Sequence, residues 1–228
     1  ALQKAEKMKK QAFADRYPYG IFSCIRTMGH IYKSRGNFDL SAQYYQEALD
    51  YMLKNMPDQD PSQLYSSLAE YYRNTQKDYA TALDYCEKAL KSAKTERNIA
   101  QAMIEKCLIL FRQGRIDEFN DCYKEAVQMA DRCKLSANVS LLIAHISKNI
   151  LDKQYEQAHA HADQLSEKGL QQHAYIYEYA KDYPNAIKYL KKYHQQLDST
   201  NNLLQLSDIA ELNTQIGAER LKMENIQA

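Results

Sequence analysis

One stretch of the sequence sets the pattern for the whole chain: residues 25–49 read IRTMGHIYKSRGNFDLSAQYYQEAL. Its first part carries apolar residues and one glycine at three- and four-residue steps, which is typical of one face of an α-helix. Arg35 and Gly36 interrupt that spacing, as expected where a helix ends in a turn. The helical spacing resumes after Phe38 and runs to the end of the stretch. These residues therefore predict two antiparallel helices joined by a short turn.

A short piece of this stretch recurs along the chain, in which a large apolar residue is followed three positions later by a small one. Five copies begin at positions 38, 79, 116, 155 and 183, so that consecutive copies are 41, 37, 39 and 28 residues apart. The copy at 116 is degenerate, because Phe119 stands where the others have Ser or Ala. These separations scatter about a period of roughly 34 residues. A single two-helix unit is too small to bury its own apolar face, so repeated units must stack. The recurrence predicts an array of helical hairpins.

The residues that recur in register resemble the tetratricopeptide-repeat family. The matching residues are Ile25, Met28, Gly29, Tyr32, Ser41, Tyr45 and Ala48 in the first copy, Leu68, Ala69, Tyr72, Ala82, Cys86 and Ala89 in the second, and Met103, Cys107, Leu110, Gly114, Phe119, Tyr123 and Ala126 in the third. The second copy has one extra residue in its turn, and two weaker copies follow. The resemblance implies an all-α fold, an α-solenoid of about five helical hairpins with a longer C-terminal helix.

The period places the hairpins at about 20–55, 61–95, 98–133, 136–167 and 169–197, after a remnant of an earlier hairpin at 1–14. We therefore expect a repeat array over residues 1–197 and a capping or linker helix over residues 198–228. Because the chain begins at Ala1, within helical sequence, we expect it to be a piece of a longer protein.

Charge balance, hydropathy and missing motifs exclude several classes of function. The chain has 30 Lys and Arg against 29 Asp and Glu, a balance that argues against a nucleic-acid footprint. It has no apolar run of about 20 residues, so no membrane contact is expected within it. Gly-rich phosphate loops and the metal motifs C-x-x-C and H-E-x-x-H are missing from the sequence. The five cysteines fit small core positions. We expect no metal, no cofactor and no enzyme activity in this segment.

The end of the chain carries a narrower resemblance. A tetratricopeptide array followed by DIAELNTQIGAERLKMEN (residues 208–225) is similar to the sensor regions of Bacteroidetes two-component histidine kinases and related membrane-bound regulators. This resemblance implies the periplasmic region of an inner-membrane protein, with a transmembrane span after it and a kinase domain elsewhere in the full-length protein. Binding of a signal ligand or protein would be relayed through the C-terminal helix, which could also mediate a homodimer. The alternative is a free-standing cytoplasmic adaptor that binds a peptide.

In this family the first helix of each hairpin faces the concave side, so the register gives candidate groove residues. These are Arg26, His30 and Lys33, then Ser66, Glu70 and Arg73, then Ile104, Leu108 and Phe111, then Ile143, Ser147 and Ile150, and finally Tyr175, Glu178 and Tyr179. Such a groove would change from basic and polar to apolar to aromatic, which suits an extended peptide with an acidic end and an apolar middle. The alternative is a solvated face at one end and ordinary helix packing at the other.

The carboxylate clamp of chaperone-binding tetratricopeptide domains can be compared position by position. The matching positions hold Arg26, His30, Ser67, Gln101 and Glu105. Only Arg26 is always cationic, and Glu105 would repel a carboxylate. We therefore predict that this groove does not bind as that clamp does.

Overall fold

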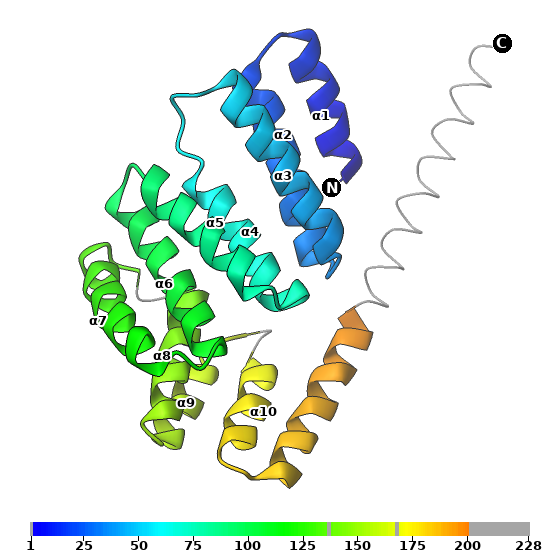
Figure 1. The fold of residues 1–228 in the computed structure, drawn as a ribbon. Coiled ribbons are helices and arrows are strands. Elements are labelled where there is room, and N and C mark those ends of the chain that lie inside the picture. The colour runs from blue at the N-terminus through cyan, green and yellow to red at the C-terminus, as the bar shows by residue number, and fades with distance from the viewer. Residues whose placement is uncertain (1, 136–137, 167–168, 201–228) are drawn as a thin grey trace, which may run out of the picture.

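The computed structural model describes residues 2–135, 138–166 and 169–200. Over this part the chain is helical and contains no strand. The helices are α1 (Leu2–Ala14), α2 (Pro18–Ser34), α3 (Phe38–Asn55), α4 (Ser62–Tyr71), the π-helical turn η1 (Tyr72–Gln76), α5 (Tyr79–Ser92), α6 (Glu96–Arg112), α7 (Ile116–Arg132), α8 (Val139–Leu151), α9 (Tyr155–Ala162) and α10 (Gly169–Tyr179). Residues 183–200 form a further helix, orange in Figure 1.

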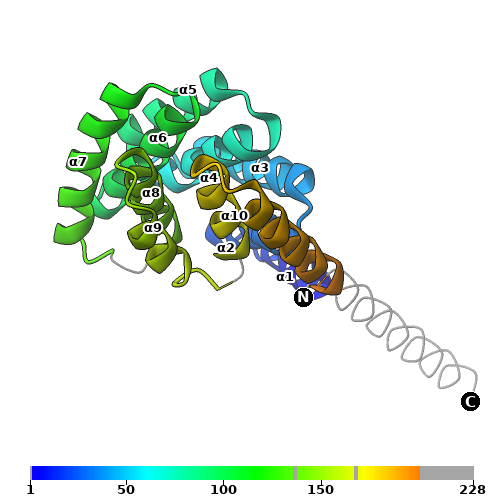
Figure 2. The same ribbon diagram turned by 90° about the horizontal axis from the view of Figure 1, so that it is seen from below.

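The helices pair as antiparallel hairpins that stack into a curved array (Figures 1 and 2). Helix α2 packs on α3, α4 on α5, α6 on α7 and α8 on α9. Successive first helices also contact one another, α4 with α6, α6 with α8 and α8 with α10. These contacts join the first helices from α4 to α10 in one continuous layer. The predicted all-α fold, a solenoid of helical hairpins, is therefore confirmed.

Local signals explain where the helices begin and end. The side chains of Asn37, Asp78, Thr95 and Asn138 each accept a hydrogen bond from the backbone N–H three residues on, which caps the first turn of a helix. The hairpin turns contain residues with positive φ, a conformation that favours glycine. Two of these residues are Gly36 and Gly114, whereas several other turns place a lysine there.

The extra residue in the second repeat is accommodated by η1. Helix α4 widens into this π-helical turn before the chain reverses at Lys77, which has a φ of 54°. The backbone N–H of Asp78 then bonds the carbonyl of Tyr72 across the widened turn. A π-helical turn accommodates one more residue than an α-turn does, so α5 still packs against α4.

Small residues lie where paired helices approach most closely, as the register predicts. Ala48, Ala69 and Ala89 have no exposed surface. A Cβ atom on Gly29 would lie only 2.7 Å from a ring carbon of Tyr45, so this position admits glycine alone without movement of that ring. The apolar core extends through the array, with its largest cluster in the hairpins from α6 to α9.

The C-terminal helix predicted over residues 198–228 falls mostly outside the described residues. The helix over residues 183–200 continues past the expected boundary at position 198. In the described part, no helix is both long and apolar enough to cross a membrane.

Candidate functional site

The inner layer of helices carries a hollow of about 250 Å³ between α2, α4, α6 and the start of α8. Most of its lining side chains are polar and uncharged. The residues that line it are Arg26, His30, Tyr45, Gln63, Leu64, Ser66, Ser67, Glu70, Gln101, Glu105, Asn138 and Ser140. Three hairpins and the start of a fourth therefore contribute to one site.

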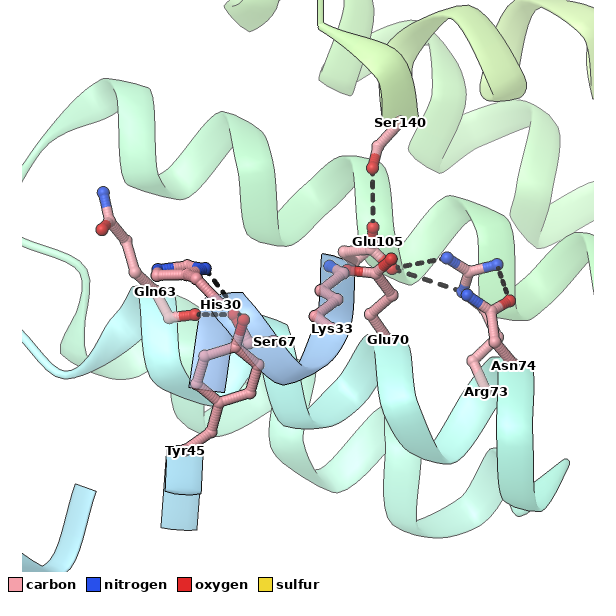
Figure 3. Close-up of polar contacts among 10 residues, drawn as sticks. All are labelled: His30, Lys33, Tyr45, Gln63, Ser67, Glu70, Arg73, Asn74, Glu105 and Ser140. Carbon is pink, nitrogen blue, oxygen red and sulfur yellow. Dashed lines mark hydrogen bonds and ion pairs between the residues drawn. The ribbon is translucent and has the colours of Figure 1, made fainter. Parts of the chain in front are cut away.

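At the α2 end of the hollow, His30 and Tyr45 form a hydrogen-bonded pair (Figure 3). The Tyr45 Oη atom lies 2.9 Å from Nδ1 of His30, and the rings meet edge to face. Burial raises the pKa of Tyr45, so the phenol keeps its proton and donates it to this bond. Loss of hydration, reinforced by the cations Arg26 and Lys33, lowers the pKa of His30. A neutral His30 accepts at Nδ1 and offers its Nε2–H as a donor.

Two ion pairs link successive inner helices beside the hollow (Figure 3). Lys33 of α2 lies 2.5 Å from a carboxylate oxygen of Glu70 on α4. Arg73 of η1 donates to one Glu105 oxygen from Nη2 at 3.0 Å and from Nε at 3.3 Å. The other Glu105 oxygen accepts a hydrogen bond of 2.9 Å from Ser140 of α8. One ion pair therefore links α2 to α4, and the other, with Ser140, links η1 to α6 and α8.

The first part of the predicted groove does gather at this hollow. Arg26, His30 and Glu70 line it, and Lys33 reaches its edge through Glu70. Arg73 is different, because only 6% of its surface is exposed and its guanidinium is occupied by Glu105. Its place is thus in the wall behind the hollow.

The expectation of an open apolar groove at Ile104, Leu108 and Phe111 is wrong. These residues are 0%, 2% and 5% exposed and belong to the core cluster that joins α6 to the next hairpin. Helix α6 packs on α4, α5, α7 and α8 at once, so its apolar residues are used in packing between hairpins. Of the two readings that the sequence left open for this segment, helix packing is the one observed.

Tyr175 and Tyr179 belong to a separate aromatic cluster on α10. Their rings lie 4.9 Å apart, and the ring of Tyr179 lies 5.9 Å from that of Phe111. The guanidinium of Arg112 stands 4.3 Å above the ring of Tyr175 and also donates to its hydroxyl. Neither tyrosine lines the hollow. The predicted continuous gradient is therefore replaced by two separate features.

Several lining residues were not among the predicted candidates, namely Gln63, Leu64, Asn138, Ser140 and, from the second helix of a hairpin, Tyr45. Register alone marks the middle of each first helix, whereas Gln63, Asn138 and Ser140 lie near helix starts. All five positions compared with the chaperone clamp line the hollow. The Glu105 carboxylate is among them, so the hollow lacks the ring of cations that such a clamp uses.

Among the residues that the structure describes, no group of three or more His, Cys, Asp or Glu side chains is placed to hold a metal ion. The six histidines lie in hairpin packing or on the surface. His159 and His173, for example, stack on each other between α9 and α10 with ring centroids 4.9 Å apart.

Comparison with known proteins supports the repeat assignment. Residues 27–51, in the first hairpin, match the family model described as tetratricopeptide repeat. No curated protein matches the chain. The fold is similar to that of BtubC (BKLC) from P. vanneervenii, with a TM-score of 0.54 and 16% identity over 88% of this chain and 91% of that one. Aspartyl phosphate phosphatase F from Bacillus subtilis gives a TM-score of 0.54 and 18% identity over 86% of this chain and 60% of that one. At these identities the likeness is one of fold.

Proposed function

We propose that this chain is the protein-binding region of a bacterial signal-transduction protein, and that its hollow receives an extended polypeptide segment. The observation that carries the proposal is the polar hollow built by three successive hairpins and the start of a fourth. Helical repeats of this kind are generally non-catalytic and bind along a concave surface that several repeats form together.

The lining suits a polypeptide backbone. Amide side chains such as Gln63 and Gln101 both donate and accept hydrogen bonds, as do hydroxyls such as Ser66 and Ser67. A peptide backbone presents alternating donors and acceptors that need such partners. A small apolar ligand would leave most of these polar groups unpaired, which is costly.

The charges favour one acidic group near α2. Glu70 and Glu105 each have a cationic partner in Lys33 and Arg73, so their charges are largely compensated. The guanidinium of Arg26, which lines the hollow, stands 5.2 Å from the ring centroid of Phe22. A carboxylate of the bound segment could pair with this guanidinium.

A peptide display library of random 12-residue segments provides a direct test. Replacing Ser67 with Trp would fill the hollow, and Arg26→Ala would remove its rim cation. We expect selected peptides to bind at least tenfold more weakly to both variants, measured by fluorescence anisotropy. Gln128→Trp, at an exposed site on α7, is the matched control. Unchanged affinity in both hollow variants would contradict this site.

The signalling part of the proposal depends on the resemblance of residues 208–225 to the linkers of histidine-kinase sensor regions. Under it, binding changes the curvature of the array and the C-terminal helix conveys that change to a following transmembrane span. Such coupling requires two conformations that the ligand binds unequally. The gene sequence after codon 228 tests it. An apolar run of about 20 residues is expected there, whereas a stop codon would favour the free-standing adaptor.

A further inference from the structure

Two cysteines of the third hairpin face each other between its helices. Cys107 on α6 and Cys122 on α7 place their sulfur atoms 2.7 Å apart. A disulfide bond measures about 2.05 Å, so the two atoms need to approach by only about 0.7 Å more. Both residues lie on regular helices whose packing fixes their separation.

One member of this pair, Cys122, takes a position where the earlier hairpins have a stacked tyrosine. Tyr44 stacks on Tyr32 in the first hairpin and Tyr85 stacks on Tyr72 in the second, with centroids 5.3 and 5.4 Å apart. In repeat register, Cys122 stands at the position of Tyr44 and Tyr85. The smaller side chain lets it meet Cys107, which holds the small-residue position of α6. In the third hairpin Leu110 and Cys122 hold the positions of the stacked tyrosines, and Cys122 contacts Cys107 instead.

We propose that Cys107 and Cys122 are an oxidisable pair whose disulfide cross-links α6 to α7. Cys122 is the attacking residue, because it is partly exposed whereas Cys107 is fully buried. Cys107 donates its S–H to the Cys122 sulfur, and this bond lowers the pKa of the Cys122 thiol despite its partial burial. The same bond and burial raise the pKa of Cys107. Thiolate character at the accessible sulfur is what peroxide reaction requires.

The chemistry balances with one hydrogen peroxide. The Cys122 thiolate attacks a peroxide oxygen and breaks the O–O bond, giving a sulfenic acid and hydroxide. The Cys107 sulfur then attacks the Cys122 sulfur, the S–O bond breaks, and the leaving hydroxide takes the Cys107 proton as water. Two thiols and one peroxide become one disulfide and two waters, so the sulfurs lose two electrons and the peroxide gains them.

Tryptic mapping tests the cross-link directly. Cleavage after Lys106, Arg112, Arg115 and Lys124 separates Cys107 in peptide 107–112 from Cys122 in peptide 116–124. After treatment of the folded chain with hydrogen peroxide and blocking of remaining thiols, we expect these two peptides joined as the main disulfide product. Oxidation in guanidinium chloride is the control, since five cysteines of an unfolded chain pair without this preference. Equal yields from folded and unfolded chains would overturn the proposal.

Two variants distinguish oxidation of this pair from oxidation of the other cysteines. Peroxide treatment should raise the melting temperature of the wild-type chain by several degrees, because a cross-link restricts the unfolded state. Cys122→Ser should abolish this rise, and Cys133→Ser, at another partly exposed cysteine of the same hairpin, should preserve it. A rise that persists in Cys122→Ser, or one that is lost in Cys133→Ser, would contradict the assignment.

Discussion

Arg73 and Glu105 form an ion pair between η1 and α6 in which both side chains are almost fully withdrawn from water. Their exposed fractions are 5% and 7%, and the Nη2 to Oε2 distance is 3.0 Å. Asn74 takes a further guanidinium N–H and Ser140 donates to the second Glu105 oxygen. Each charged group is therefore compensated by several partners, and the pair ties three successive hairpins together.

Removing one member of this pair should destabilise the array strongly. We expect Glu105→Ala to lower the free energy of unfolding by about 3 kcal/mol or more, because it leaves the Arg73 charge buried without its partner. Urea denaturation measures this change. The control is Asp84→Ala, which breaks an exposed pair with Lys88 and should cost below about 1 kcal/mol. Equal effects of the two substitutions would contradict the prediction that the buried pair contributes more to the free energy of unfolding than the exposed pair.

Replacing both members with apolar residues should be less harmful than removing one. The double variant Arg73→Met, Glu105→Leu leaves no uncompensated charge, so we expect it to be more stable than Glu105→Ala. A double-mutant cycle by urea denaturation gives the coupling energy. A double variant less stable than either single one would contradict this account.

Gly29 should resist even the smallest enlargement. A Cβ atom there would stand 2.7 and 2.8 Å from two ring carbons of Tyr45. Because Tyr45 is buried and bonded to His30, its ring cannot move without disturbing the hollow. We expect Gly29→Ala to lower the free energy of unfolding by about 1–3 kcal/mol. Thr27→Ala, at an exposed position of the same helix, is the control, and a similar small effect for both would contradict the packing argument.

At a turn residue with positive φ, we expect a substitution to stabilise the chain instead of destabilising it. Lys153 has a φ of 59° in the turn between α8 and α9, where Gly114 of the α6–α7 turn has 72°. A side chain in this conformation costs up to about 1 kcal/mol relative to glycine. We expect Lys153→Gly to raise the melting temperature and Gly114→Ala to lower it, measured by circular dichroism. Shifts of the same sign in both would contradict the prediction.

The repeat signal predicted the fold well because it encodes packing within each hairpin. Gly29, Ala48 and Ala69 are small because paired helices approach each other closely at these positions. The site was less predictable. Periodicity places Phe111 on the inner side of α6, but whether it faces solvent depends on how closely α8 packs, which no local pattern states. The sequence likewise predicts a surface cation at Arg73, because it does not show that Glu105 lies beside it.

We expect the stability of the chain to depend on pH through two partly buried histidines, His145 and His159. Burial lowers the pKa of His145, which bonds Tyr123 and stacks on His161. Burial, with the nearby His173, also lowers the pKa of His159.

Because these pKa values lie below the unfolded value of about 6.5, the unfolded chain binds protons first as the pH falls. The stabilisation that comes from keeping these histidines neutral is therefore fully present above the unfolded pKa. It is lost as the pH falls from the unfolded pKa towards the lower pKa of the folded chain. We expect urea denaturation to show a lower free energy of unfolding at pH 5.5 than at pH 7.5. His145→Gln should reduce this difference, because it removes the partly buried imidazole that resists protonation in the folded chain, whereas Gln128→Ala, at an exposed position on α7, should leave it unchanged. A pH dependence that is the same in wild type and His145→Gln would mean that other groups carry it.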